Sequence, residues 1–229
     1  MIHIVIEDDH TKEIDFEVRK LVNAARSARD TETVIKHMEE LRKTGIAVSD
    51  EFPIFYPKTS DKLITNDRFE VLPGSKTSGE VEFVLLLDKD KIYVTVGSDH
   101  TDRELQKTNL LAAKQIYYNV IAPKVWNYEQ VKGHWDSIIM RSWVEDNGQR
   151  QLYQEGTAGE IMKPEKIIEE VKHRVTGDLN GMVIFSGTLP TLSGNLSFSP
   201  RFEVELIDEH LQRAIKHAYT VEPINWFQK

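Results

Sequence analysis

The sequence contains no cysteine, and this absence excludes several kinds of chemistry. With no thiol among its 229 residues, the chain cannot form disulfides, thiolate nucleophiles or zinc–thiolate sites. Long apolar runs are also missing, so no segment is expected to span a membrane. The start, MIHIVIEDDH, lacks the basic and then apolar stretches of a signal peptide. We therefore expect a cytoplasmic protein without a membrane partner.

An excess of basic residues is missing as well. The chain has 29 Lys and Arg against 37 Asp and Glu, a formal net charge of −8, which argues against nucleic acid as a partner. A small anion can still bind an acidic protein where a metal ion or a few local bases neutralise it. Apolar residues make up 40% and charged residues 29% of the chain, a balance typical of globular proteins.

No repeat, low-complexity tract or flexible linker divides the chain, so we expect one continuous domain. Hairpins of strands outnumber helices, which favours an antiparallel-rich α+β fold around one sheet core. Asn147-Gly148 is a typical two-residue turn for one of the hairpins. The expected elements are hairpins at 2–18, 80–98 and 137–156, helices at 19–44, 103–121 and 163–175, strands within 182–188 and 202–221, and a long irregular stretch at 51–79.

Two glutamates open the strand-like run GEVEFVLLLDKDKIYVTVGSD. Glu80 and Glu82 share the strand face that carries Val84 and Leu86, because side chains two residues apart point the same way. If Leu87 pairs with Ile92 across the DKDK turn, Glu80 lies opposite Asp99 and Glu82 lies opposite Gly97. Opposed residues have Cβ atoms roughly 5 Å apart. The three carboxylates would then share one patch, where Gly97 leaves room for an ion or substrate.

Like charges opposed in this way destabilise a sheet unless something compensates for them. Three converging carboxylates suit a hard divalent cation such as Mg²⁺, so Glu80, Glu82 and Asp99 are candidate metal ligands. The alternative is a solvated strand edge. Glu203 and Glu205 offer a comparison within the chain. Pairing in their hairpin sets Lys216 opposite Glu205 and Ala218 opposite Glu203, which is an ordinary salt-paired outer face.

His37 and Glu40 are candidates for general base chemistry. They stand three residues apart in KHMEELR, on one face of a helical turn. A carboxylate that orients a histidine makes a competent base at neutral pH. The alternative is a surface histidine in a charged helix.

Other residues could bind a substrate anion. Arg103 follows Asp99, and Lys114 lies on the next expected helix, although such side chains are usually solvated. Gly187 and Thr188 end a strand and could offer a backbone N–H group and a hydroxyl, or form a plain turn. We interpret residues 134–136, His-Trp-Asp, as structural.

In order along the chain, these features resemble the fumarylacetoacetate hydrolase superfamily, and most resemble a divergent branch of it. The segment SDHTDRELQ and the Glu-x-Glu pair are the most specific parts of the resemblance, which runs from about residue 25 to the C-terminus. The matching segments are H37-M-E-E40, P53-I-F55, E80-V-E82, D99-H-T-D-R-E-L-Q106, Lys114 and G187-T188.

The resemblance implies a β-rich, mixed-sheet roll of the type of the family's C-terminal domain, usually dimeric. Residues 1–50 would form an N-terminal hairpin and lid helix, and 51–229 the metal-binding catalytic roll. Mg²⁺, Mn²⁺ or Ca²⁺ would be held by Glu80, Glu82 and Asp99. The substrates would be 2-oxo or 2,4-dioxo acids that react through an enolate.

The same resemblance implies roles for the other candidates. His37, oriented by Glu40, would activate water, and Lys114 would polarise the oxyanion. Arg103, Gly187 and Thr188 would position the substrate.

The leading hypothesis is a metal-dependent hydrolase that cleaves a C–C bond. The alternatives are an oxaloacetate-type decarboxylase, a 2-oxo-dienoate hydratase or isomerase, and a catalytically silent homologue that binds a metal and an oxo acid. The family's Gly-Asp before the last core strand reads Gly181-Met182 here, and the loop after Thr188 is altered. These departures concern the substrate more than the metal.

Overall fold

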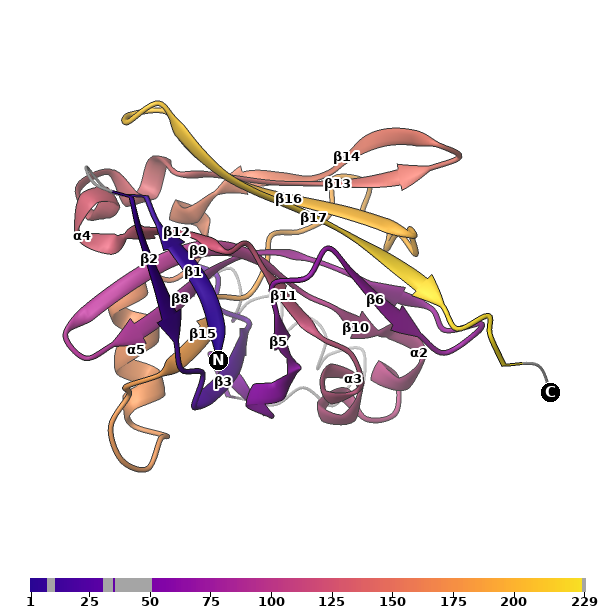
Figure 1. Ribbon diagram of the computed structural model, residues 1–229, viewed down its shortest axis with the longest axis horizontal. Coiled ribbons are helices and arrows are strands. Elements are labelled where there is room, and N and C mark those ends of the chain that lie inside the picture. The colour runs from indigo at the N-terminus through magenta and orange to yellow at the C-terminus, as the bar shows by residue number, and fades with distance from the viewer. Residues whose placement is uncertain (8–10, 31–34, 36–50, 228–229) are drawn as a thin grey trace.

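Two β-sheets form most of the protein in a computed structural model that describes residues 1–7, 11–30, 35 and 51–227. Within these residues the larger sheet has ten strands in the order β2-β1-β12-β9-β8-β15-β3-β4, with β11 and β5 joined beside β9. The smaller sheet has five strands in the order β14-β13-β16-β17-β6. It lies across one side of the larger sheet (Figure 1). The mixed-sheet, β-rich roll expected from the sequence is confirmed.

The hairpins that the sequence predicts are present with their expected pairings. β1 (Ile2–Ile6) pairs with β2 (Lys12–Phe16), β8 (Val81–Asp88) with β9 (Lys91–Asp99), and β13 (Ile139–Asp146) with β14 (Gln149–Thr157). Asn147 and Gly148 both have positive φ, of 50° and 73°, as a tight hairpin turn requires. β15 (Met182–Phe185), β16 (Arg201–Asp208) and β17 (Arg213–Pro223) are the predicted late strands.

The helix predicted from residue 19 is wrong over its first turns. KLVNAA forms strand β3 (Lys20–Ala25), which pairs in parallel with β15 and antiparallel with β4 (Ile54–Lys58). Leu21, Val22 and Ala24 are buried, so sheet pairing on both sides overrides the helical preference of this segment.

Two further elements differ from the prediction. The stretch 103–121 is not one helix but α2 (Arg103–Gln106), α3 (Leu110–Ile116) and β11 (Asn119–Ile121). The predicted helix is interrupted between α2 and α3 because Asn109 caps the start of α3. Its side chain accepts a hydrogen bond of 3.0 Å from Ala112 N–H. The stretch 51–79 is not irregular throughout. It contains β4, the 3₁₀ turn η1 (Ser60–Lys62), β5 (Leu63–Ile64), β6 (Arg68–Val71) and β7 (Thr77–Ser78).

Helix α5 (Pro164–Lys172) packs its apolar side against the core between the two sheets. It is the amphipathic helix predicted from KPEKIIEEVK, and it buries Ile167 and Val171. The remaining elements are β10 (Thr101–Asp102), β12 (Lys124–Asn127), α4 (Tyr128–Val131), η2 (Lys132–Ser137) and η3 (Ala158–Glu160). No helix of the described residues is both long and apolar enough to span a membrane.

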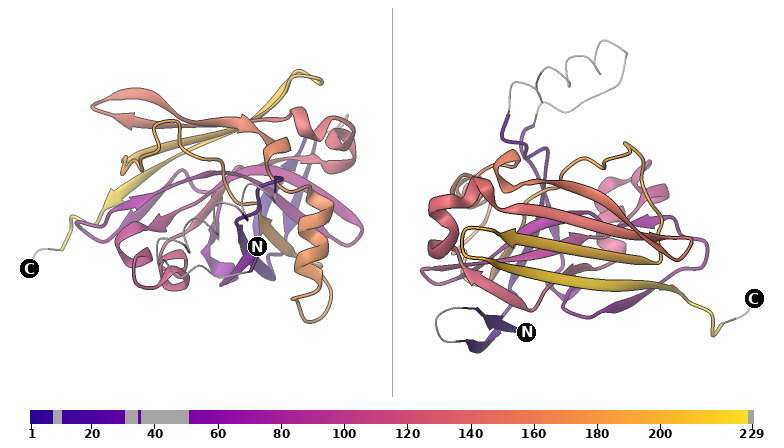
Figure 2. Two further views of the ribbon diagram at one scale, coloured as in Figure 1. Left: turned by 180° about the vertical axis from the view of Figure 1, so that it is seen from behind. Right: turned by 90° about the horizontal axis from the view of Figure 1, so that it is seen from above.

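Strand β8 is buried on both faces and divides the core. Val81, Phe83 and Leu85 belong to the cluster between the two sheets, whereas Val84 and Leu86 belong to a second cluster on the opposite face. Figure 2 shows the smaller sheet as a separate layer over this arrangement, with the C-terminal end of β17 extending past it. The second face is the one that the register argument assigns to Glu82, so its carboxyl group lies at the end of an apolar surface.

Candidate active site

The pairing of β8 with β9 follows the predicted register. Leu87 pairs with Ile92 and Glu82 with Gly97, and the ladder ends at Val81 and Ser98. Glu80 stands just before β8, where its N–H donates a hydrogen bond of 3.0 Å to Ser98 Oγ. The start of β8 and the end of β9 therefore place Glu80, Glu82 and Asp99 at one end of the sheet.

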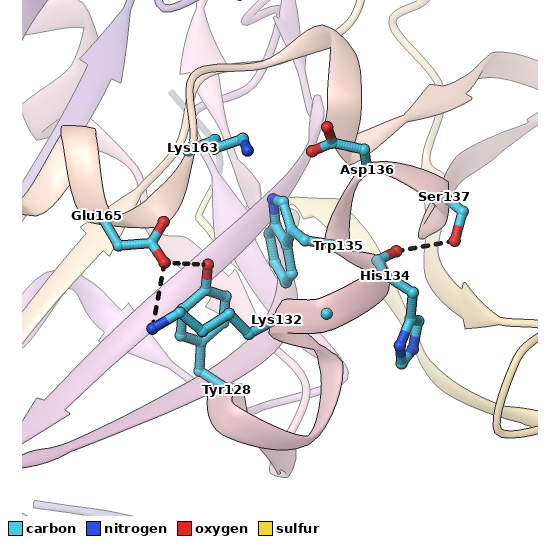
Figure 3. Close-up of a pocket in the computed structure, with 9 residues that line it drawn as sticks. Tyr128, Lys132, His134, Trp135, Asp136, Ser137, Lys163 and Glu165 are labelled. Atoms are coloured by element: carbon cyan, nitrogen blue, oxygen red, sulfur yellow. Dashed lines mark hydrogen bonds and ion pairs between the residues drawn. The ribbon is translucent and has the colours of Figure 1, made fainter.

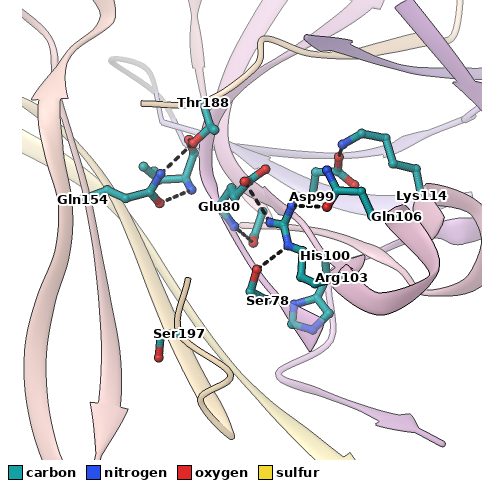
Figure 4. A network of polar contacts seen from close by, with 12 residues as sticks. Ser78, Glu80, Asp99, His100, Arg103, Gln106, Lys114, Gln154, Thr188 and Ser197 are labelled. Atoms are coloured by element: carbon teal, nitrogen blue, oxygen red, sulfur yellow. Dashed lines mark hydrogen bonds and ion pairs between the residues drawn. The ribbon is translucent and has the colours of Figure 1, made fainter. Parts of the chain in front are cut away.

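Each of the three carboxyl groups is paired by the protein itself. Asp99 is fully buried and forms an ion pair with Lys114 (Figure 4). Glu80 Oε1 lies 2.8 Å from Arg103 Nη2. Glu82 is 2% exposed, and its Oε2 accepts a hydrogen bond of 2.7 Å from Gly187 N–H. The structure thus gathers most of the predicted site residues into one buried network.

Short helices aim the two predicted cations at this network. Asp102 caps α2 by accepting hydrogen bonds from Glu104 N–H and Leu105 N–H at 3.1 and 2.9 Å. Arg103, 7% exposed, then donates from Nε to Ser78 Oγ at 2.6 Å and from Nη1 to Gln106 Oε1 at 2.9 Å. Lys114 stands near the end of α3 and is equally buried. Both side chains are buried in this network rather than solvated at the surface.

Lys58 joins the site although no pattern in the sequence indicates it. It ends β4 with a fully buried side chain, and its ammonium lies 3.8 Å from Asp99 Oδ1. It donates a hydrogen bond of 2.7 Å to Asn119 Oδ1, and Asn119 Nδ2 in turn donates to Asn23 Oδ1 at 2.7 Å. The only local signal is a lysine at the end of an apolar strand, IFYPK, which is too common to single out.

Burial controls the charge of these groups. Burial and the nearby Asp99 raise the pKa of Glu82 well above its usual range. Burial also opposes ionisation of Asp99, but Lys114 and Lys58 outweigh it and hold the pKa of Asp99 below its usual value. Burial lowers the pKa of Lys58 to about 8. The site therefore holds one carboxyl group that is easily protonated and one amine that is easily deprotonated.

Gly187 and Thr188, the expected donors to a substrate anion, lie at the head of β8. Thr188 Oγ1 donates to Val81 O at 2.7 Å and accepts from Gln154 Nε2 at 2.9 Å. The Gly187 N–H group points to Glu82. Both predicted donors are therefore engaged by strand β8 or its side chains.

Gly97 does not leave room for an ion or substrate, and that expectation is wrong. A Cβ atom at this position would lie 2.7 Å from Val120 O, 2.9 Å from Ile121 Cγ2 and 2.9 Å from Phe185 Cε1. The missing side chain instead lets β11 and Phe185 pack closely against β9.

The comparison hairpin behaves as the sequence predicts. Glu205 pairs with Lys216 and Glu203 with Ala218 across β16 and β17. Lys216 forms an ion pair with Glu205, and Arg150 with Glu203 at 2.7 Å. The two Glu-x-Glu pairs differ in their surroundings: Glu82 lies on a strand with apolar layers on both sides, whereas Glu203 and Glu205 lie on a face where each is paired with a basic side chain.

His37 and Glu40 lie outside the described residues. His134, Trp135 and Asp136 are structural, as interpreted from the sequence: Trp135 is 3% exposed, His134 Nε2 lies 2.9 Å from Asp208 Oδ1, and Arg29 pairs with Asp136 at 2.9 Å. They line a cavity of about 510 Å³ next to Glu165, which binds Tyr128 and Lys132 (Figure 3). This cavity contains none of the predicted catalytic or metal-binding residues.

Comparison with known proteins places the chain in a family. A family model described as "Protein of unknown function (DUF2848)" matches residues 24–219. The chain belongs to the DUF2848 family. No curated protein matches the sequence.

Solved structures relate the fold of this DUF2848 chain to a wider group. A yeast fumarylacetoacetate hydrolase family protein, ynq8, is 19% identical with a TM-score of 0.65, covering 93% of this chain and 97% of its own. A 2-keto-3-deoxy-D-arabinonate dehydratase is 16% identical with a TM-score of 0.65, covering 91% and 74%. Cg1458 is 18% identical with a TM-score of 0.66, covering 93% and 80%. The fold is that of the fumarylacetoacetate hydrolase family, and the resemblance seen in the sequence is confirmed at this level.

That fold family implies a divalent metal, and the donor set of this DUF2848 chain can be tested against it. Three carboxyl groups are hard oxygen ligands, and the buried Asp99 Oδ1 has no hydrogen-bond partner among the described residues. Both observations fit an ion. Within the described part of the chain, however, no three acidic or histidine side chains gather closely enough to hold one. An ion would require the three carboxylates to draw together and away from Lys114 and Arg103.

Proposed function

We propose that this protein is a divalent-metal-dependent enzyme that acts on a small 2-oxo or 2,4-dioxo acid, with hydrolysis of a C–C bond as its reaction. One observation carries the proposal. Glu80, Glu82 and Asp99 meet at the end of β8 and β9 with Lys58, Lys114 and Arg103 around them. A purely structural role explains this poorly, because several buried charges cost more free energy than an apolar core would.

Glu80, Glu82 and Asp99 would hold Mg²⁺, Mn²⁺ or Ca²⁺. A bound divalent cation supplies an electrophile for the negative charge that develops on an enolate. It would also favour ionisation of Glu82, whose pKa burial and Asp99 raise. The protein's own cations would then be free to bind the substrate.

Lys114, released from Asp99, would bind the oxyanion, and Arg103 would bind a substrate carboxylate. Arg103 is suited to this because its guanidinium already binds a carboxylate, Glu80 Oε1, 2.8 Å from Nη2, and a metal ion on Glu80 would leave that nitrogen to a substrate carboxylate. Thr188 would orient the substrate from the end of β15. His37, oriented by Glu40, would activate water for attack on the distal carbonyl.

Lys58 extends this proposal. Burial lowers the pKa of its ammonium group to about 8, which allows it to donate and accept a proton near neutral pH. This observation favours dehydration as the second candidate reaction, because loss of a hydroxyl group needs a proton donor.

The test is a substrate panel with Mg²⁺: an acylpyruvate, oxaloacetate and a 2-keto-3-deoxy sugar acid. We expect the acylpyruvate to be cleaved, and His37→Ala to lower kcat at least 100-fold. A decarboxylase would act on oxaloacetate and keep much of its activity in His37→Ala. A dehydratase would act on the sugar acid and lose activity in Lys58→Met. A silent homologue would bind oxalate with Mg²⁺ in calorimetry and turn over none of the three.

The proposal also includes a cytoplasmic homodimer. Light scattering coupled to gel filtration would measure the oligomeric state directly. A monomer at micromolar concentration would exclude the dimer without affecting the reaction proposed above.

A further inference from the structure

A chain of hydrogen bonds joins the head of β8 to a buried histidine. Ser98 Oγ accepts a hydrogen bond of 3.0 Å from Glu80 N–H and lies 2.7 Å from Tyr219 Oη. Tyr219 Oη lies 3.2 Å from His100 Nδ1. Ser98, His100 and Tyr219 have no exposed surface. The hydrogen bonds therefore link the backbone of Glu80, one candidate metal ligand, to Ser98 and His100. These two residues lie on either side of Asp99, another candidate ligand.

His100 sits in a box of aromatic rings. The ring centroids of Phe69, Phe202 and Tyr219 lie 5.0, 5.4 and 5.8 Å from that of His100, and each ring is close to perpendicular to the imidazole. Tyr117 completes the box at 6.4 Å. The imidazole is therefore enclosed by aromatic rings and has no exposed surface.

The contacts of His100 give the hydrogen-bond chain one direction. His100 Nε2 has no hydrogen-bond partner among the described residues, whereas Nδ1 faces the Tyr219 hydroxyl group. A proton on Nε2 can face the aromatic rings, which leaves Nδ1 as the acceptor. The order is then Glu80 N–H to Ser98, Ser98 to Tyr219, and Tyr219 to His100. Each hydroxyl group donates once and accepts once.

Gly79 shows that this arrangement is tight. A Cβ atom at Gly79 would collide with Tyr219 Oη and would lie 2.5 Å from Ser98 Oγ. Gly79 separates Glu80 from Ser78, the residue that accepts the Arg103 Nε hydrogen bond. The backbone that carries Glu80 therefore approaches the hydroxyl chain as closely as the polypeptide allows.

We infer that Ser98, Tyr219 and His100 are positioning residues that fix Glu80 relative to Asp99. The β8–β9 ladder ends at Val81 and Ser98, so it does not itself hold Glu80. The Ser98 hydroxyl continues the pairing by one residue, and Tyr219 and His100 hold that hydroxyl in place. The part that concerns the metal rests on the function proposed above, whereas the backbone restraint does not.

The restraint is tested without metal by amide hydrogen exchange. We expect the Glu80 N–H group to exchange at least tenfold faster in Ser98→Ala, and to exchange faster in Tyr219→Phe. Tyr117→Phe is the matched control, because Tyr117 also contacts His100 but its hydroxyl binds Leu72 N–H and Ser75 Oγ instead. Equal exchange at Glu80 in Tyr219→Phe and Tyr117→Phe would overturn the inference.

The effect on the metal is tested by calorimetry with Mg²⁺. Loss of residues that hold metal ligands in place usually weakens binding 10- to 100-fold, and we expect a loss of this size in Ser98→Ala and Tyr219→Phe. Tyr117→Phe should change the Kd less than threefold, even at equal loss of thermal stability. Wild-type affinity in Tyr219→Phe would overturn the positioning role. Absence of Mg²⁺ binding by the wild type would instead refute the proposed function and leave the exchange result to decide the restraint.

Discussion

Gly187 N–H donates a hydrogen bond of 2.7 Å to Glu82 Oε2 and so ties the end of β15 to the head of β8. The two strands are paired neighbours in the larger sheet. The hydrogen bond places a backbone donor beside a carboxyl group that is buried between apolar residues. Glu82 is therefore held in one orientation whether or not it is ionised.

Gly187→Ala should destabilise the protein strongly. Gly187 has a φ of 85°, and a Cβ atom there would collide with Ser27 Oγ. Backbone strain and overpacking together should cost about 2–5 kcal/mol, measured by denaturant unfolding. Gly194→Ala is the control, since Gly194 has a φ of 72° but a Cβ atom there would meet no other atom within 4 Å. It should cost only the strain, about 1–2 kcal/mol. Equal losses would show that Ser27 moves aside.

Glu82→Gln should stabilise the metal-free protein at neutral pH. Glu82 has a raised pKa in the folded state and an ordinary value of 4.5 when unfolded, so folding takes up a proton above pH 4.5. Stability contributed by this group is present below pH 4.5 and is lost as the pH rises toward the folded pKa, by about 1.4 kcal/mol for each pH interval of one. In EDTA, the variant's advantage should grow as the pH rises above 4.5.

The control for this variant is Glu203→Gln on the paired outer face of the smaller sheet. It removes a carboxylate of the same type without removing a buried one. A pH profile of Glu82→Gln that runs parallel to the wild type would contradict the raised pKa. Mg²⁺ calorimetry of the same variant tests the proposed ligand set, because equal binding by wild type and Glu82→Gln would exclude Glu82 as a ligand.

Lys114→Met should leave Asp99 as a buried charge without its ion-pair partner, balanced only in part by Lys58 and Arg103. Removal of one partner from a buried ion pair typically costs about 3–5 kcal/mol. The pKa of Asp99 should rise as a result, because Lys114 is the main group that lowers it. Chemical denaturation at pH 7 measures the loss. Lys107→Met, which breaks an exposed pair with Glu104, should change stability little, and a similar effect of both variants would contradict the buried pairing.

His100→Phe should make the protein less sensitive to acid. The folded pKa of His100 is about 3, below the ordinary value of 6.5. The stability that comes from keeping this histidine neutral is fully present above pH 6.5 and is lost as the pH falls. The loss reaches roughly 5 kcal/mol near pH 3. Phe keeps the aromatic packing and cannot titrate. The slope of stability against pH between 6.5 and 4 should flatten in His100→Phe but not in His173→Phe, whose histidine is exposed.

Local patterns in the sequence predict much of the fold. The Asn147-Gly148 turn, the alternation around it and the apolar run of β8 are each encoded by neighbouring residues. The register of β8 and β9 is the one obtained if Leu87 pairs with Ile92 across the DKDK turn. No Asn-Gly turn fixes it, and a slip by one residue would move Asp99 to the other face. That register is the basis for predicting that Glu80, Glu82 and Asp99 lie together.

The same reasoning fails where distant partners decide the outcome. KLVNAA has helical character but lies between β15 and β4, both far away in the chain. Lys58 and Tyr219 reach the site from strands separated from it in sequence, and nothing near them marks either as special. The space beside Gly97 is filled by Phe185 and Ile121, which no local pattern could show.

The sequence by itself determined which acids share one end of the sheet, because strand pairing follows the two-residue period of the chain. Tertiary structure alone decided what surrounds them. Packing of β4, α3 and β17 against that end places Lys58, Lys114 and Tyr219 near the carboxylates and Ser98. Burial then shifts the pKa values of Lys58 and Glu82. The charge states on which any chemistry at this site depends arise from removal of water, and that is a property of the assembled core rather than of any segment.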